Sequence, residues 1–187
     1  MLGNLLLYQK KGFYINDMGL DISLSFNYSS NYTKIDEVGC GYGWSHSFNI
    51  YYILHGNNVE IIRSNGDREM FTYNALSQQY EAPTGVTDTL VHFSSSNLYV
   101  LQTKYGNQLF FENSTKLTKI RDINGNEVVL TYNTAGALIT DITAPSGRSL
   151  TLQYNNAKLE KVIDDNGTAS REINLSYSSN MLTKFTD

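Results

Sequence analysis

Apolar and polar residues alternate along much of this chain, and a period of two is the pattern of a β-strand with one buried face. The clearest run is 20–28, which alternates over nine positions. Three later runs repeat the pattern, and each ends in a tyrosine on the apolar face. Their apolar positions are Val128, Leu130 and Tyr132, then Leu150, Leu152 and Tyr154, then Ile173, Leu175 and Tyr177. We therefore predict an all-β chain.

The segment 116–187 contains one unit three times, followed by the start of a fourth. The copies open with Leu117, Leu138, Leu159 and Leu182, at spacings of 21, 21 and 23 residues. Their strand-like runs close with Tyr132, Tyr154 and Tyr177, at spacings of 22 and 23 residues. A fixed period of this length indicates a repeat architecture.

A glycine divides each unit into two halves, at Gly125, Gly147 and Gly167. Asn-Gly pairs supply the positive φ angles of a tight hairpin turn. We predict turns at 65–66, 106–107, 124–125, 146–147 and 166–167. A single hairpin is only marginally stable in water, so the units must pair side by side. The expected fold is an antiparallel meander of hairpin repeats, which forms a curved sheet or an open segment of a β-solenoid shell.

The chain divides into three parts of one continuous repeat domain. Residues 1–58 form an N-terminal β segment, residues 59–115 form degenerate hairpin repeats, and residues 116–187 form the regular repeats. We expect opening strands within 5–15, a strand through Phe48, Ile50 and Tyr52, and hairpins at 59–73 and 98–112. We expect 74–88 to be an irregular connection.

The N-terminal part contains three glycines at alternate positions before the only tryptophan: Gly39, Gly41 and Gly43 precede Trp44. This spacing indicates a bend in the backbone with a bulky side chain packed behind it. We predict that Trp44 is largely buried and anchors the N-terminal strands onto the first hairpins.

The composition excludes some classes of function. The chain has 187 residues, 41% of them hydrophobic, and a net charge of −4 without a basic stripe, which argues against a nucleic-acid partner. No apolar run approaches the roughly 20 residues of a membrane-spanning helix. The single cysteine, Cys40, excludes an internal disulfide framework. The N-terminus does not have the pattern of a signal peptide, so we expect either another export route or an internal piece of a longer protein, and favour the second.

The sequence resembles the Rhs/YD-repeat family of bacterial polymorphic toxins and Tc-toxin shells, which has relatives in the teneurins. The residues that carry the resemblance are Gly3-Asn4-Leu5, the strand 20–28, the run 41–47, the run 122–126, Leu130-Thr131-Tyr132-Asn133, Gly136 and Leu138. The similarity covers nearly the whole chain. It departs from the family after the repeat tyrosines, where Asn133, Asn155 and Ser178 replace the aspartate.

The resemblance implies a structural role. Members of the family wind hairpins into a hollow shell that encloses a C-terminal toxin, so the expected partners are further YD repeats and that toxin. The implied location is the bacterial cell surface or the exterior. The aspartyl self-cleavage segment that closes such shells does not occur before Asp187, so we expect this chain to be the opening part of a shell. The alternative function is a β-rich, adhesin-like surface module that recognises a glycan or a protein.

Catalytic, metal and cofactor chemistry find little support in the residues. His46, His55 and His92 lack metal-ligand spacing, and Ser45 and His46 point to opposite faces of a strand, so we expect no enzyme and no cofactor. Asp141, Asp164 and Asp165 suit turns better than calcium. Cys40 is expected to be a packed side chain. The repeat tyrosines would form a sugar-binding ladder if exposed, but their position beside the leucines favours packing.

The last unit stops after its first half, at 182–187. A strand there would present unpaired backbone groups along one side, and such an edge is a template for another strand. We expect the edge to fray or to pair with a second copy of the chain.

Overall fold

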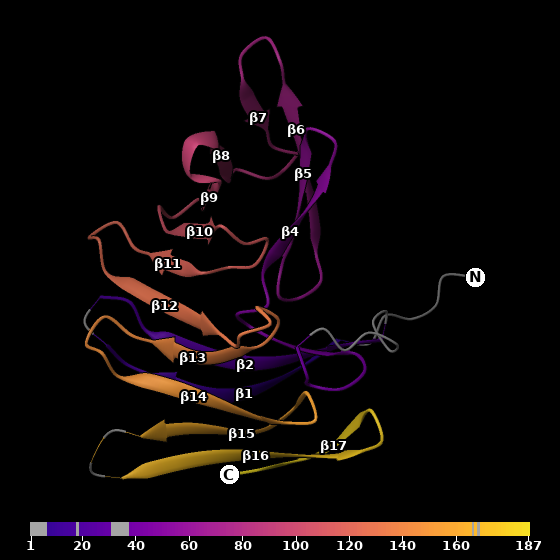
Figure 1. The fold of residues 1–187 in the computed structure, drawn as a ribbon, viewed down its shortest axis with the longest axis vertical. Helices are drawn as coiled ribbons and strands as arrows, with labels where there is room; N and C mark the ends of the chain where they lie inside the picture. The colour runs from indigo at the N-terminus through magenta and orange to yellow at the C-terminus, as the bar shows by residue number, and fades with distance from the viewer. Residues whose placement is uncertain (1–6, 18, 31–37, 166, 168) are drawn as a thin grey trace.

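The structure, a computed structural model, describes residues 7–17, 19–30, 38–165, 167 and 169–187. Within these residues the chain folds into seventeen strands in three antiparallel sheets, with one short 3-10 turn, η2 (Ser94–Ser96), and no α-helix (Figure 1). In that same part of the chain, no helix has the length and apolar character needed to traverse a bilayer. The predicted all-β, antiparallel fold class is confirmed.

The largest sheet has ten strands that follow one another in sequence order from β8 to β17, as expected for a meander. Each repeat copy supplies two neighbouring strands of this sheet, and the fourth copy supplies β17. The strands are β8 (Thr89–Phe93), β9 (Leu98–Gln102), β10 (Gln108–Glu112), β11 (Lys119–Arg121), β12 (Glu127–Tyr132), β13 (Ile139–Thr143), β14 (Ser149–Asn155), β15 (Lys158–Asp165), β16 (Ser170–Ser178) and β17 (Met181–Thr186).

A register irregularity recurs at the same place in every copy, directly before the repeat tyrosine. The pairing shifts between Thr131 and Tyr132, between Gln153 and Tyr154, and between Ser176 and Tyr177. In each case the extra, unpaired residue of the bulge lies on the opposing strand, at Thr140, Glu160 and Thr183. The spacing of the tyrosines therefore reflects a repeated backbone feature as well as repeated packing.

The predicted turns occur, but their type differs from the expected one. In the turn from Arg63 to Asp67, the Gly66 N–H donates to the Arg63 carbonyl at 2.8 Å, and the Arg63 N–H donates to the Asp67 carbonyl at 2.8 Å. Gly66 has a φ of 89°, whereas Asn65 is not among the residues with positive φ. This is a three-residue loop, a type I turn followed by a left-handed glycine. The same pattern of bonds closes the turns at Gly106, Gly125 and Gly147. The turn at 166–167 lies partly outside the described residues.

Two smaller sheets come from the N-terminal half of the chain. The first contains β1 (Leu7–Ile15), β2 (Ile22–Ser29) and β3 (Trp44–His46). The second contains β4 (Tyr51–His55), β5 (Asn58–Ile62), β6 (Arg68–Asn74) and β7 (Gln79–Glu81). The predicted hairpins at 59–73 and 98–112 are present as β5–β6 and β9–β10.

Two expectations for the N-terminal half are wrong. Phe48 and Ile50 do not belong to a strand; they lie in the connection between β3 and β4, where the Ile50 N–H donates to the Phe48 carbonyl at 2.9 Å. Phe48 is nonetheless buried, so its apolar character reflects packing and not strand alternation. The segment 74–88 contains a short strand, β7, which pairs with β6.

Both small sheets pack against the ten-stranded sheet. The first sheet packs on its C-terminal half: the rings of Phe26 and Phe185 are 5.1 Å apart, and the Arg171 guanidinium lies 5.2 Å from the Phe13 ring. Figure 1 shows β1 and β2 alongside β13 and β14. The second sheet packs near β9 and β10, where the Tyr52 ring lies 4.7 Å from that of Tyr99. Buried residues from all three sheets form one hydrophobic cluster. Its largest fully buried side chains include Phe26, Phe71, Phe111, Leu101, Leu117, Ile142, Leu150 and Leu159.

Strand β17 is an edge of the ten-stranded sheet. Among the described residues it pairs only with β16, and β8 forms the opposite edge. The expected unpaired edge is therefore present. Its ability to recruit another strand stays a prediction.

Candidate functional site

The glycine segment before Trp44 is bound to the turns of the repeats. The Leu159 N–H donates to the Gly39 carbonyl at 2.7 Å, and the Tyr42 N–H donates to the Asn180 carbonyl at 2.8 Å. Leu159 is the second residue of β15, and Asn180 lies in the turn directly before β17. The N-terminal sheet is thus attached through backbone hydrogen bonds to both ends of the third repeat copy.

Glycine is needed at these positions because the repeats approach the backbone closely. A Cβ atom on Gly39 would lie 2.4 Å from the Ala157 carbonyl oxygen, and one on Gly41 would lie 2.9 Å from the Asn180 carbonyl oxygen. Gly43 would meet the Tyr28 ring at 2.6 Å. All three have positive φ, at 74°, 87° and 79°, which other residues adopt only with strain. The sequence spacing correctly indicated a bend.

The glycines inside the repeats have a different role. Gly125, Gly147 and Gly167 have φ values of 87°, 88° and 81°, and no atom lies within 4 Å of a Cβ built on any of them. Glycine is favoured at these positions because φ is positive, and not because a side chain would collide with a neighbour. Asp122 closes the first of these turns, because its carboxylate accepts the Asn126 side chain at 2.8 Å and the backbone N–H groups of Asn124 and Asn126. The Asn126 side-chain bond and these backbone bonds hold the pKa of Asp122 below its usual value.

The repeat tyrosines lie on the face of the ten-stranded sheet that contacts the hydrophobic cluster, here called the inner face, and pack against that cluster. The Tyr132 hydroxyl donates to the Leu117 carbonyl at 2.7 Å, and the Tyr177 hydroxyl donates to the Leu159 carbonyl at 2.8 Å. Each bond joins the closing tyrosine of a copy to its opening leucine. The equivalent hydroxyl of Tyr154 is buried and has no hydrogen-bond partner among the described residues. Burial raises the pKa of Tyr132 and of Tyr154. The packing interpretation is confirmed, and the exposed sugar-binding ladder is wrong.

Trp44 differs from the prediction in burial and in its partner. It is partly buried, and its ring lies 5.4 Å from Tyr28, 6.0 Å from Tyr8 and 5.4 Å from Phe185. Phe185 belongs to β17, the last strand of the long sheet. Trp44 therefore packs against the C-terminal edge of the repeats and not against the first hairpins.

The candidate titratable residues are dispersed. His46 is buried with no partner for either ring nitrogen within the described part of the chain, and burial lowers its pKa to about 4. His55 bonds to Glu60 at 3.0 Å, and His92 stacks on Tyr99 with ring centres 4.0 Å apart. Ser45 accepts a hydrogen bond from Asn49 at 3.1 Å. Among the described residues, no group of three or more His, Cys, Asp or Glu could hold a metal ion.

The aspartates that would have suited calcium have other partners. Asp164 is buried between two arginines: its carboxylate accepts Arg148 at 2.8 Å and also accepts Arg171. Asp141 accepts the Thr151 hydroxyl at 3.1 Å, and Asp165 accepts the Gly167 N–H at 2.9 Å. Cys40 is fully buried, as expected for a packed side chain.

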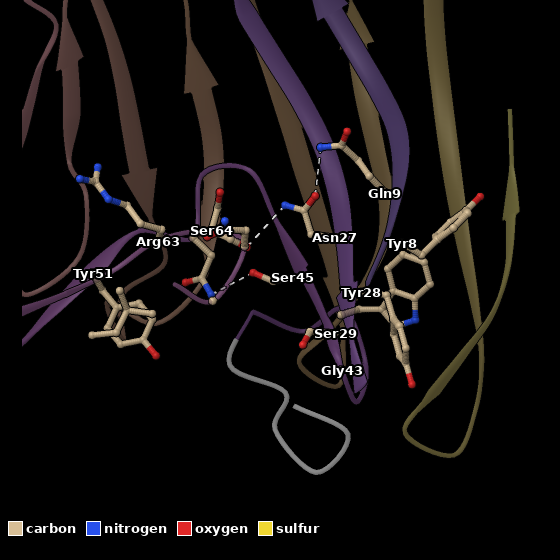
Figure 2. A pocket seen from close by; sticks show the side chains of 15 residues that line it. Tyr8, Gln9, Asn27, Tyr28, Ser29, Gly43, Ser45, Tyr51, Arg63 and Ser64 are labelled. Atoms are coloured by element: carbon tan, nitrogen blue, oxygen red, sulfur yellow. Dashed lines mark hydrogen bonds between the residues drawn. The ribbon is translucent and has the colours of Figure 1, made fainter. Parts of the chain in front are cut away.

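A cleft of about 250 Å³ opens between the first sheet and the turn that joins β5 to β6. Figure 2 shows Asn27 and Ser45 in its centre, with Tyr8 and Tyr28 on one side and Tyr51 and Ser64 toward the other. The lining residues come from three separate segments: β1, the region from β2 to β4, and the turn after β5. No sequence motif brings these segments together, which is why the cleft was not predicted.

Comparison of the sequence with protein-family models and with curated proteins finds no match.

Proposed function

We propose that this chain is a structural shell segment of an exported or surface-displayed bacterial YD-repeat protein. In the longer parent protein, further repeats extend the sheet and the shell encloses a C-terminal toxin. The chain contributes no catalysis and takes no cofactor in this role.

The observation that supports this proposal best is the regular addition of strands by the repeats. Every copy of 21–23 residues adds two strands to the same sheet, with the register shift at the same place. Such units depend on their neighbours for a buried face, and an array of them builds an extended wall. The N-terminal sheet covers the inner face of that wall through the glycine segment. These features suit a scaffold that continues at β17.

The scaffold is tested by adding the next half unit. A chimera carries residues 166–180 again after Asp187, so that a copy of the strand β16 can pair with β17. We expect the thermal unfolding midpoint and the urea m-value to rise, because the new strand buries additional surface. A chimera with the same added residues in scrambled order is the control. Equal midpoints and m-values for the two chimeras would contradict an extendable array.

The enclosing role is tested on the parent protein. Its C-terminal segment should resist a protease that digests the same segment when it is expressed alone, because the shell excludes the protease. Equal digestion in both forms would contradict the proposed shell, even if the chimera behaves as an extendable array.

A further inference from the structure

We propose that the aromatic row formed by Trp44, Tyr28 and Tyr8 is the docking surface for the next strand that adds to β17, and that Tyr8 packs on the apolar face of that strand. The inference rests on the proposed function, because it needs a repeat array that continues past β17. In this arrangement the first sheet supplies part of the core of the following repeat.

The aromatic row crosses the three strands of the first sheet at one level. Tyr8 of β1 lies opposite Tyr28 of β2, and Tyr28 lies opposite Trp44 of β3. The rings are in contact, because the Trp44 ring centre is 5.4 Å from that of Tyr28 and 6.0 Å from that of Tyr8. Residues that are directly opposed in a sheet point to the same face, so the three rings share one face.

This face of the first sheet is the one that packs on the repeats. Phe26, two residues before Tyr28 on β2, is fully buried, and its ring lies 5.1 Å from that of Phe185 on β17. Residues two apart on a strand point to the same side. The Trp44 ring also lies 5.4 Å from that of Phe185. The aromatic row therefore continues the interface between the first sheet and the last strand of the ten-stranded sheet.

The row ends in solvent at Tyr8. Trp44 and Tyr28 are partly buried, whereas Tyr8 is 55% exposed. Tyr8 belongs to β1, which pairs only with β2 among the described residues. Figure 2 shows its ring on the opposite side of β1 from Gln9, toward the yellow C-terminal strands. Because Trp44 contacts both Tyr8 and Phe185, a single side chain separates the exposed ring from the strand whose edge is free.

The existing repeats indicate which side chains the added strand would carry. In β16 the apolar residues on the inner face are Ile173, Leu175 and Tyr177. Ile173 lies opposite Val162, and Phe185 holds in the fourth copy the place that Val162 holds in the third. A new strand that pairs with β17 in this way places an apolar residue beside Phe185.

That apolar residue comes within reach of the open end of the row. Neighbouring strands lie about 4.8 Å apart, and Tyr8 is the next ring along the row after the one that contacts Phe185. Covering an exposed aromatic ring with an apolar side chain removes both from water and adds a ring contact, and both effects stabilise the added strand. The free energy that the strand gains should therefore depend on Tyr8.

The test uses the chimera that carries residues 166–180 again after Asp187. Tyr8→Ser is introduced into the chimera and into the 187-residue chain, and urea denaturation of the four proteins gives a double-mutant cycle. We expect the stability gained from the added strand to fall to about half or less in the Tyr8→Ser background, because the contact with Tyr8 is lost. Tyr8→Phe keeps the ring and should retain the gain. The emission of Trp44, the only tryptophan, should shift to shorter wavelength in the chimera and shift less when Tyr8 is serine.

Tyr14→Ser is the matched control. Tyr14 is on the same strand as Tyr8 and is 57% exposed, but it points away from the repeats, between the buried residues Phe13 and Ile15. Its hydroxyl donates to Asp21. Loss of this side chain should lower the stability of the chain and of the chimera equally, so the gain from the added strand should stay the same.

The outcomes separate this inference from the proposed function. A full gain in the Tyr8→Ser chimera would overturn the docking role of Tyr8 and leave the extendable array intact. The same reduction with Tyr14→Ser as with Tyr8→Ser would also overturn it, since the effect would not depend on the face of β1. Equal stability of the ordered and scrambled chimeras would overturn both the array and the docking surface.

Discussion

The Tyr177 hydroxyl donates to the Gly39 carbonyl oxygen at 3.2 Å, although 138 residues separate the two along the chain. The same hydroxyl lies 2.8 Å from the Leu159 carbonyl oxygen, so its single proton is shared between the two carbonyls. One side chain thus closes its own repeat and also binds the N-terminal glycine segment. The repeats and the segment that covers them are therefore expected to unfold together.

The tyrosine hydroxyls give the first prediction. Tyr177→Phe leaves two buried carbonyls without this donor and should lower the free energy of unfolding by about 1–2 kcal/mol. Tyr154→Phe is the matched control, because the Tyr154 hydroxyl has no partner among the described residues. Its removal should be neutral or slightly stabilising. Urea denaturation measures both, and equal losses in the two variants would contradict the hydrogen-bond assignment.

The glycine segment gives the second prediction. Gly39→Ala should cost more than about 2 kcal/mol, because the new methyl group meets a backbone carbonyl at 2.4 Å and the φ is positive. Gly125→Ala has a positive φ but open space, so it should cost only about 1 kcal/mol. Thermal unfolding of the two variants separates the cost of the steric clash at Gly39 from the cost of a positive φ alone. A smaller loss for Gly39→Ala than for Gly125→Ala would show that the segment can move away from the repeats.

Trp44 gives the third prediction. Emptying a fully buried aromatic site costs about 3–5 kcal/mol, but Trp44 is only partly buried, so Trp44→Ala should cost about 2–3 kcal/mol. Part of this loss should disappear in a Phe185→Ala background, because the two rings contact each other at 5.4 Å. Tyr105→Ala, at an 83% exposed position, is the control and should leave stability unchanged. Additive losses at Trp44 and Phe185 would exclude direct coupling between the first sheet and β17.

The period of the sequence predicted the strands and turns well because both depend on local patterns. The alternation ending at Tyr132, Tyr154 and Tyr177 located β12, β14 and β16. The turn type at Asn65-Gly66 was missed because loop length depends on strand pairing, which the two residues alone do not determine. The partner of Trp44 was also missed: contact with Phe185 joins residues 141 positions apart. The cleft could not be predicted for the same reason, since three distant segments form it.

His46 gives a prediction about pH. Its pKa is about 4 in the folded chain and near 6.5 when unfolded, because burial disfavours the charged ring. Between these values only the unfolded chain gains a proton, so stability should fall as the pH decreases from 6.5 toward 4, by at most about 3 kcal/mol. Carboxylates with lowered pKa, such as Asp122 and Glu127, lose their contribution only below about pH 4.5.

Urea denaturation between pH 7 and pH 5, where those carboxylates stay ionised, isolates the effect of His46. His46→Leu should flatten the dependence of stability on pH in this range. A variant that keeps the wild-type slope would show that another group is responsible for it.

The free edge of β17 gives the last prediction. Strand β17 pairs with β16 on one side, and the backbone groups on its other side can accept a further strand. We expect the chain to associate with a second copy through this edge at high concentration.

Phe185 packs against Phe26 and Trp44, so a charge at Phe185 would damage the core. Met181 is 66% exposed and Thr183 is the residue skipped in the pairing of β16 with β17. Proline is tolerated at such a bulge and blocks pairing at an edge, so the test variant is Met181→Lys with Thr183→Pro. Light scattering should show a mass that rises with concentration for the wild type and stays monomeric for the variant. Monomers for both, or the same association for both, would rule out the edge as the contact.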